Sequence, residues 1–378
     1  MLKDVVVPTA LYHLTVAEAL EAGKLASPFM AWLWHEGRPI ASTKLVDGHG
    51  VCDIASWASQ QAVAPDTGSP AAVPHTVSVI ICTRDRPEQL DRCLASLAGQ
   101  TFQPHEVLVV DNASSTTETA EVVSRHGHIY LREDRAGLSH ARNTGIAAAS
   151  GDIVAFTDDD TVLHPDWLLR LEAAFDTDHV WAATGLVIPA ELRTEAQCIF
   201  ELGWSFGHGF VRKDYDASYY QKTRMRGTPT WEFGAGASMA FRRDIFNKIG
   251  LFDPHLGAGA SGCSEDSEIW YRILHAGGLC RYEPASVLYH FHRADMAGLQ
   301  KQIRAYMRGH VVALWIQYRK SSDIGNLRRL LISLPRYYLR KVCRRVLHGI
   351  TVPTCTLGDE IAGYFSGLHH IVKNHRSL

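Results

Sequence analysis

The alternation of short apolar runs with amphipathic helical stretches is the feature that most constrains this fold. After residue 75, segments typical of buried strands alternate with segments whose apolar residues recur at helical spacing. The expected strands and helices are, in chain order, residues 77–82, 87–97, 107–110, 116–125, 129–131, 139–149 and 153–156. Strands separated by helices form a parallel sheet with right-handed crossovers. The sequence therefore predicts an α/β fold whose strands all end at one edge of the sheet.

Polar side chains follow three of these strands at the point where each strand ends. They are Thr83, Arg84 and Asp85 after the first strand, Asp111 and Asn112 after the second, and Asp158, Asp159 and Asp160 after the fourth. Ligands of open α/β sheets bind at the carboxyl ends of the strands, so we expect these residues to converge. Three adjacent carboxylates repel one another unless a cation is near, and their hard oxygens suit Mg²⁺ or Mn²⁺. A solvated acidic turn is the alternative interpretation.

Charge and composition exclude several classes of protein. The 378 residues carry 38 Lys and Arg against 40 Asp and Glu, and 46% are hydrophobic, which indicates a globular chain and no nucleic-acid partner held by bulk charge. No run approaches the ~20 apolar residues of a membrane span, and we expect no signal peptide. The eight cysteines form no CxxC pair, which favours reduced thiols and a cytoplasmic protein.

The sequence suggests four segments. Residues 62–75 carry three prolines and a glycine and are typical of a linker, which leaves residues 1–61 as a small N-terminal domain of unknown role. There, Thr15 and Glu18 predict a capping box opening a short helix, with Val16, Ala19 and Leu20 on one apolar face. Residues 30–35 predict a buried segment, residues 76–300 the α/β domain, and residues 301–378 a helical extension.

The order of motifs resembles a known family. The stretches VSVIICTRDRPEQLDRCLASLAGQTFQPHEVLVVDNAS and GLSHARNTGIAAASGDIVAFTDDDTVLHPDWL are similar to the nucleotide-sugar domain of family 2 glycosyltransferases, over about residues 77–293. The resemblance implies a GT-A fold, a Rossmann-like and mostly parallel sheet flanked by helices. It also implies an inverting transfer of a sugar from a nucleotide-diphosphate donor, assisted by Mn²⁺ or Mg²⁺.

The resemblance assigns donor contacts to residues at matching positions. Thr83, Arg84 and Asp85 would hold the nucleoside. Asp111 or Asn112 would reach the base. The identity of the base stays open, because many relatives have two acids at this place. Arg142 would contact the diphosphate or the acidic turn. Asp158 would contact the ribose or the sugar, with Asp159 beside it. Trp231 and Gly236 would lie along the donor sugar and the acceptor.

The metal and the general base are assigned in the same way. Asp160 would bind the metal with Asp158, and His290 would complete the site, with His292 as the alternative. Asp266 would take the proton of the acceptor hydroxyl, with Glu265 as the neighbouring candidate. Both acids would also suit the N-terminus of a helix, which favours negative charge.

The C-terminal extension has its own pattern. From residue 319 to 349, nine Lys or Arg accompany one acid and interleave with leucines, and Pro335 predicts a break between two helices. Basic amphipathic helices bind anionic membrane surfaces, and many family 2 enzymes act on lipid-linked acceptors. We therefore expect peripheral contact with the cytoplasmic membrane face, against the alternative of a helical face packed on the α/β domain.

The leading hypothesis is an inverting, metal-assisted glycosyltransferase that adds a sugar to a hydroxyl of a glycan or lipid-linked acceptor, in polysaccharide or other surface-glycan synthesis. A sugar-phosphate nucleotidyltransferase is disfavoured because the loop CTRDRPEQL lacks glycine, and a dinucleotide-dependent oxidoreductase because no GxGxxG follows a strand. A non-catalytic nucleotide-sugar-binding module is disfavoured by the acids at 158, 160 and 266.

Overall fold

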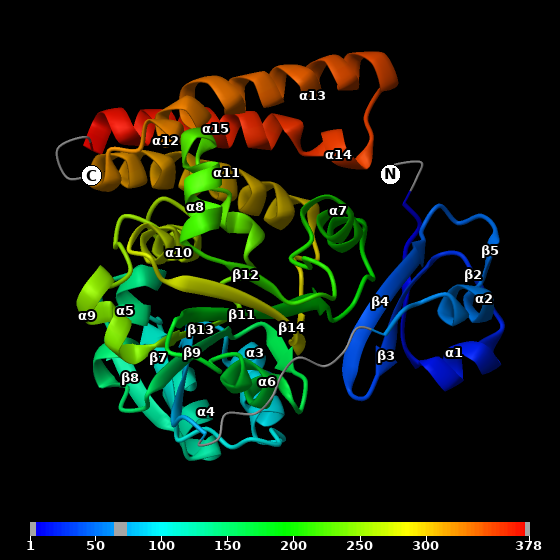
Figure 1. The fold of residues 1–378 in the computed structure, drawn as a ribbon, viewed down its shortest axis with the longest axis horizontal. Coiled ribbons are helices and arrows are strands. Elements are labelled where there is room, and N and C mark those ends of the chain that lie inside the picture. The colour runs from blue at the N-terminus through cyan, green and yellow to red at the C-terminus, as the bar shows by residue number, and fades with distance from the viewer. Residues whose placement is uncertain (1–4, 64–73, 375–378) are drawn as a thin grey trace.

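The computed structural model describes residues 5–63 and 74–374, so most of the predicted linker lies outside the described residues. A central α/β layer carries a small β unit at one side and a layer of helices on top (Figure 1). The elements of the small unit are β1 (Ala10–Thr15), α1 (Val16–Ala22), β2 (Lys24–Ala26), β3 (Phe29–His35), β4 (Arg38–Leu45), β5 (Val51–Asp53) and α2 (Ile54–Ser59).

The central layer begins with the predicted alternation of strands and helices. Its first half comprises β6 (Val77–Thr83), α3 (Pro87–Leu97), β7 (Glu106–Asn112), α4 (Glu118–His126), β8 (Ile129–Glu133), α5 (Leu138–Ala148) and β9 (Ile153–Asp158). Its second half comprises β10 (Thr161–Leu163), α6 (Trp167–Ala173), β11 (Val180–Pro189), α7 (Glu195–Trp204), β12 (Lys213–Tyr215), α8 (Ala217–Thr223), β13 (Ser238–Arg242), α9 (Phe246–Ile249), α10 (Glu265–His275) and β14 (Leu279–His290). Every element predicted between residues 77 and 156 is present, with boundaries shifted by a few residues.

One sheet spans the layer in the order β10-β14-β11-β13-β9-β6-β7-β8, with β12 paired to β14. Strands β9, β6, β7 and β8 are mutually parallel, as predicted. Strand β13 runs antiparallel between β9 and β11 and joins the two halves. The direction of β13 and its place in the sheet depend on long-range pairing, which the local sequence pattern does not indicate.

The strand register brings the predicted polar ends together. Cys82 of β6 pairs with Asp158 of β9, and Thr83 pairs with Asp111 of β7. At the other side of β9, Thr161 of β10 pairs with His290, the last residue of β14. This pairing places His290 beside the acidic turn between β9 and β10.

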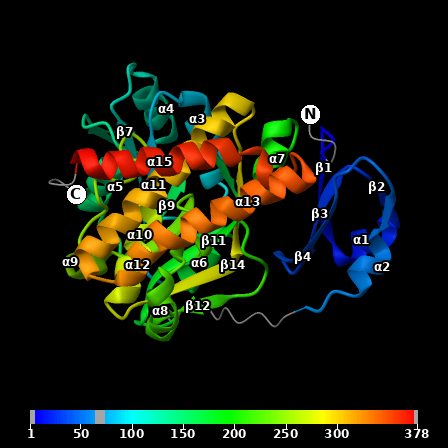
Figure 2. The same cartoon turned by 90° about the horizontal axis from the view of Figure 1, so that it is seen from above.

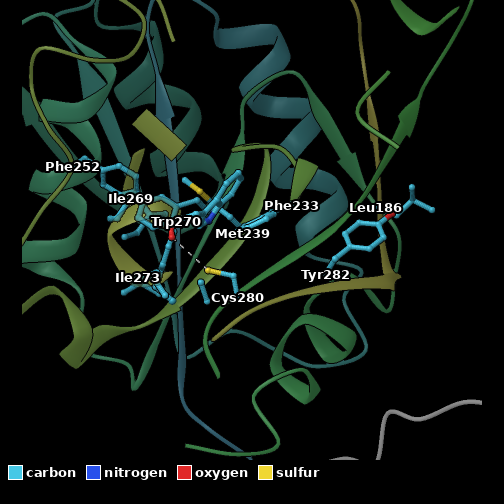
Figure 3. Close-up of a cluster of buried hydrophobic side chains, with 14 of the residues drawn as sticks. Leu186, Phe233, Met239, Phe252, Ile269, Trp270, Ile273, Cys280 and Tyr282 are labelled. Carbon is cyan, nitrogen blue, oxygen red and sulfur yellow. Dashed lines mark hydrogen bonds between the residues drawn. The ribbon is translucent and has the colours of Figure 1, made fainter. Parts of the chain in front are cut away.

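The core explains why α10 has a fixed position. Ile269, Trp270 and Ile273 on its inner face are fully buried with Phe233 and Cys280, and Figure 3 shows these side chains packed together beside the sheet. Burial of this aliphatic and aromatic surface stabilises the fold by about 25 cal/mol per Å². The acidic first turn of α10 is therefore held rigidly relative to the sheet.

The small unit confirms one prediction and corrects another. Thr15 and Glu18 form the expected capping box at the start of α1, and the predicted buried segment is strand β3. Ala19 is fully buried, but Leu20 is 49% exposed. The expectation that Leu20 shares the buried face was wrong, because this helix has only two turns and packs along a narrow stripe. Trp34 stacks on His164, so the unit packs beside β10 and β14.

The C-terminal part is helical, as predicted, and begins within the expected α/β segment. Its elements are α11 (Met296–Ser321), α12 (Ile324–Arg328), α13 (Leu334–His348), α14 (Val352–Cys355) and α15 (Leu357–Asn374), with a π-helical turn at Arg329–Ser333. The predicted break at Pro335 was wrong: helical structure continues from α12 through the π-helical turn into α13, because Pro335 stands in the first turn of α13, where a helix tolerates proline. Figure 2 shows α11, α13 and α15 lying across the central layer.

Candidate active site

The acidic turn lies where β9 ends, and its three carboxylates have different surroundings. Asp159 and Asp160 are buried, whereas the side chain of Asp158 is 35% exposed. Thr83 donates its hydroxyl hydrogen to Asp159 over 2.7 Å. Arg86 Nη1 lies 3.0 Å from Asp159 Oδ1 and 3.3 Å from Asp160 Oδ2. Asp159 therefore anchors the turn to the loop after β6, and Asp158 and Asp160 remain for a ligand.

His290 completes a group of possible metal ligands. Its Nε2 lies 3.3 Å from Asp160 Oδ1, and one ligand atom each from Asp158, Asp160 and His290 lie within 4.8 Å of one another. Within residues 5–63 and 74–374, no other three His, Cys, Asp or Glu side chains form such a group. Two carboxylates and an imidazole are suitable ligands for Mn²⁺, and carboxylate oxygens also suit Mg²⁺. The residues present thus fit the divalent cation that the sequence predicts.

His292 lies behind His290 and outside this group. The two Nδ1 atoms are 3.0 Å apart, and His292 Nε2 lies 3.2 Å from Oε2 of Glu201 on α7. Burial lowers the pKa of His292, which keeps its ring neutral. Of the two histidines that the sequence left open, His290 faces the acidic turn and His292 faces Glu201.

Electrostatic coupling separates the pKa values of the acids. Burial, and then the neighbouring Asp160, raise the pKa of Asp159 to about 6. Burial alone would raise the pKa of Asp160, but His290 and the arginines nearby bring it below its ordinary value. Burial would lower the pKa of His290, and the charge of Asp160 raises it instead. Opposite charge thus outweighs desolvation where the acidic turn meets β14.

Arg142 connects the acidic turn to the start of α10. It is buried on α5, with Nη1 2.5 Å from Glu265 Oε1 and Nη2 3.7 Å from Asp158 Oδ1. Its guanidinium lies 5.4 Å from the ring centre of Phe252, which shields this ion pair from water. These distances place Arg142 beside the acidic turn, and its contact with a diphosphate stays a prediction.

Two backbone amides hold Asp266 in the same site. Gly236 N donates to its Oδ2 over 3.0 Å, and Ser267 N donates to its Oδ1 over 2.6 Å. A Cβ on Gly236 would lie 3.0 Å from Arg142 Nη2 and 3.1 Å from Asp266 Oδ2. A larger residue at this position would therefore push Arg142 or Asp266 away by a few tenths of an ångström. Glu265 is buried, and burial raises its pKa to about 7 despite Arg142.

In the loops after β6 and β7, several side chains that were predicted to contact the donor bind other groups of the protein. Asp111 is buried and accepts hydrogen bonds from Tyr130 and Arg132 over 2.7 and 2.9 Å. Asn112 binds backbone groups of the loop before α5, among them Gly137 N at 2.8 Å. The side chains of Arg84 and Asp85 are about half exposed at the same edge.

Trp231 contacts the helical layer. The guanidinium of Arg329 lies 3.8 Å from the centre of its ring, and the ring of His310 meets it edge-on at 4.9 Å. One indole face is thereby covered by a cation from the C-terminal region. The sequence did not predict this contact, because it depends on helices far along the chain.

Three polar residues at the site escaped the sequence prediction. Arg86 stands beside the named residues Arg84 and Asp85, and its position directly before Pro87, at a helix start, was a usable signal. Arg293 lies 3.8 Å from Asp160, at the end of the stretch YHFHR. Glu201 gave no signal, because nothing in its local sequence separates it from a surface acid.

Comparison with known proteins gives a consistent result. Residues 78–250 match the model of the family described as "Glycosyl transferase family 2". The chain is 26% identical over 193 residues to a glucosyl-dolichyl phosphate glucuronosyltransferase of Haloferax volcanii, covering 48% of this chain and 57% of that protein. It is 26% identical over 291 residues to glycosyltransferase AglE of the same organism, covering 73% of this chain and 87% of that protein.

A solved structure supports the fold. The mannosyltransferase PcManGT of Pyrobaculum calidifontis, in complex with GDP-Man and Mn²⁺, superposes with a TM-score of 0.55 at 18% identity. The match covers 81% of this chain and 90% of that chain. With these matches, the strand order and the ordered motifs, residues 78–250 form a domain of glycosyltransferase family 2, a family of transferase enzymes, and the chain has the GT-A fold.

Proposed function

We propose that this chain transfers a sugar from a nucleoside diphosphate donor to a hydroxyl group, with inversion at the reacting carbon. One observation carries the proposal: Arg142 lies between Asp158 of the acidic turn and Glu265, the neighbour of Asp266, so a cation site and a base share one place in the fold. Such a transfer needs charge neutralisation at the leaving group and proton removal at the incoming group.

Asp158, Asp160 and His290 would hold Mn²⁺ or Mg²⁺. The cation, when bound, supplies Lewis-acid stabilisation of the negative charge that develops on a departing diphosphate. Arg293, whose side chain is 42% exposed, lies at the same carboxylate and is placed to meet a phosphate oxygen. The solved relative with GDP-Man and Mn²⁺ supports this combination of ligands.

Asp266 would act as the general base. Its two backbone hydrogen bonds orient the carboxylate, and each oxygen retains a lone pair for the proton of an acceptor hydroxyl. Inversion follows from a single displacement, for which one base opposite the leaving group is sufficient. Glu265 is engaged by Arg142 and is the poorer candidate.

The helical layer suggests where the acceptor is found. Among the described residues, no helix is both long enough and apolar enough to cross a membrane. Helix α13 nevertheless has an unpartnered apolar stripe: Leu339 is 64% exposed and Val346 79% exposed, whereas Leu334 and Tyr338 on its inner face are buried. In Figure 1 this helix forms the outer edge of the layer, with α15 and α11 beneath it.

Basic side chains accompany this stripe. Arg336, Arg340 and Arg344 are exposed and recur every four residues, so they form one row along the helix beside Leu339 and Val346. An apolar stripe with a row of arginines suits the headgroup region of an anionic membrane. We therefore propose that α13 lies on such a membrane and that the acceptor is lipid-linked, as for the relative named for glucosyl-dolichyl phosphate. The product would enter a polysaccharide or other surface glycan.

A panel of UDP-, dTDP-, GDP- and CDP-sugars, with and without Mn²⁺, tests the donor proposal. We expect one nucleotide class to raise the melting temperature only with Mn²⁺, and slow release of its nucleoside diphosphate. The Asp160→Asn variant should lose both effects. If every nucleotide stabilised the protein without metal, the result would contradict the proposal and favour a binding module. If the protein released pyrophosphate from a sugar phosphate and a nucleoside triphosphate, the result would favour a nucleotidyltransferase.

A further inference from the structure

We infer that Glu201 and His292 form a positioning relay that fixes the orientation and tautomer of His290. The inference rests on the proposed function, because it assigns His290 Nε2 to the divalent cation. It adds two residues that contact neither donor nor acceptor in the proposed reaction. The relay runs from α7 through the segment after β14 to the acidic turn.

The first step is the contact between Glu201 and His292. Oε2 of Glu201 lies 3.2 Å from Nε2 of His292. A carboxylate only accepts hydrogen bonds, so Nε2 of His292 carries the hydrogen. The other carboxylate oxygen, Oε1, accepts a hydrogen bond from the hydroxyl of Ser205 over 2.9 Å. Glu201 is thus held at both oxygens, and His292 has one allowed neutral tautomer.

The second step follows from that tautomer. With its hydrogen on Nε2, a neutral His292 presents a lone pair at Nδ1, and Nδ1 of His290 lies 3.0 Å away. His290 must therefore donate from Nδ1, so the nitrogen left to bind a cation is Nε2, which lies 3.3 Å from Oδ1 of Asp160. A bound cation takes the place of the hydrogen that Nε2 otherwise donates to this carboxylate. Hydrogen bonds from the second ring nitrogen to a carboxylate commonly orient metal-binding histidines in this way, and here a second imidazole lies between.

Packing protects the relay from water. Glu201, His290 and His292 are each less than a tenth exposed. The ring of Phe206 lies edge-on to His290 at 5.4 Å and to His292 at 6.1 Å, and Phe200 packs on His292 at 4.6 Å. Aromatic walls exclude competing hydrogen-bond partners, so the direction of each hydrogen bond is set by the carboxylate alone.

Binding of Mn²⁺ alone, followed by electron paramagnetic resonance of the free ion, tests the relay without turnover. Glu201→Leu and His292→Phe should each weaken Mn²⁺ binding by about 10- to 100-fold, the usual cost of losing an outer partner of a metal ligand. The double variant should be no weaker than the worse single variant, because both changes break the same chain of hydrogen bonds. Glu201→Gln keeps an acceptor oxygen and should lose less, which preserves the test if the leucine variant folds poorly.

Glu191→Leu is the matched control. Glu191 lies just before α7 and accepts a hydrogen bond from Nε2 of Gln197, which also lies 3.4 Å from the backbone oxygen of His292. Its variant therefore changes the surroundings of the His292 backbone and leaves the hydrogen bonds of both imidazoles in place. Its variant should bind Mn²⁺ as the unchanged protein does. Unchanged Mn²⁺ affinity in Glu201→Leu, or additive losses in the double variant, would overturn the relay alone. Failure of the unchanged protein to bind Mn²⁺ or Mg²⁺ would overturn the proposed function as well.

Discussion

Arg142 and Glu265 form a buried ion pair, with 2.5 Å between Nη1 and Oε1. The same guanidinium lies 3.7 Å from Asp158, so a single cation on α5 connects the acidic turn to the first turn of α10. Neither carboxylate is near Arg142 in the sequence. The strand order and the packing of α10 bring the three together.

Removal of Arg142 should strongly destabilise the fold. In an Arg142→Met variant, Glu265 would lose its partner and be buried either as an unpaired charge or as a protonated acid, and breaking such a buried pair costs about 3–5 kcal/mol. An Arg142→Met, Glu265→Leu double variant should recover part of that loss, because neither charge then remains. Denaturant unfolding of the three proteins measures the effect, and a double variant less stable than Arg142→Met would show that the pair is not the cause.

Asp266→Asn should slow turnover and leave donor binding intact. A general base contributes about 100- to 10,000-fold, and the amide keeps one oxygen, for the backbone N–H of either Gly236 or Ser267, but cannot take a proton. Steady-state kcat together with the thermal shift by donor and Mn²⁺ checks both parts. A variant with undiminished kcat would remove Asp266 from the reaction.

Gly236→Ala should displace the base without unfolding the protein. Its Cβ would lie 3.0 Å from Arg142 Nη2 and 3.1 Å from Asp266 Oδ2, so one of the side chains must move. Misplacement by a fraction of an ångström to 1 Å can reduce kcat by up to about 100-fold. Gly358→Ala in α15 is the control, because its Cβ would meet no atom within 4 Å. Equal kcat in the two variants would argue against the positioning of Asp266 by this strand.

Vesicle binding should depend on α13. We expect the protein to sediment with vesicles of phosphatidylcholine mixed with phosphatidylglycerol, and much less with phosphatidylcholine alone. At about 1 kcal/mol for each arginine, Arg336→Gln, Arg340→Gln and Arg344→Gln together should weaken binding by about 100-fold. Leu339→Glu with Val346→Glu should also abolish it by removing the apolar stripe.

The control for this experiment is Val211→Glu, which changes a side chain that is 62% exposed outside the helical layer. It should bind vesicles as the unchanged protein does. If the α13 variants sedimented with vesicles as well as the unchanged protein does, the membrane proposal would be contradicted. A concentration-dependent dimer that only the α13 variants lose would identify a second copy of the chain as the occupant instead.

The sequence was sufficient for the elements whose pattern is local. The strands at 77–83 and 153–158 follow from β-branched runs, and the parallel pairing explains why Thr83, Asp111 and Asp158 meet. The sequence could not separate His290 from His292, because alternation places both on the same side of a strand. Only the contacts with Asp160 and Glu201 distinguish them.

Long-range packing accounts for most of what the sequence missed. The basic extension was expected either to pack on the α/β domain or to contact a membrane, and its helix α11 packs on that domain. Gly309 of α11 has so little room beside Cys263 that a Cβ would lie 2.5 Å from its carbonyl oxygen, just before Asp266 in the chain. Helix α13 presents its apolar stripe outward. No local pattern indicates which helix of such a tail is buried.

Anomalous diffraction at the manganese edge, from crystals grown with Mn²⁺ and the stabilising nucleoside diphosphate, tests the central claim most directly. We predict one strong peak bounded by Asp158, Asp160 and His290, with diphosphate oxygens at the same ion and Asp266 facing the space beside it. A diphosphate bound without that peak, or a peak at a site that excludes His290 and the acidic turn, would contradict the assignment of this site.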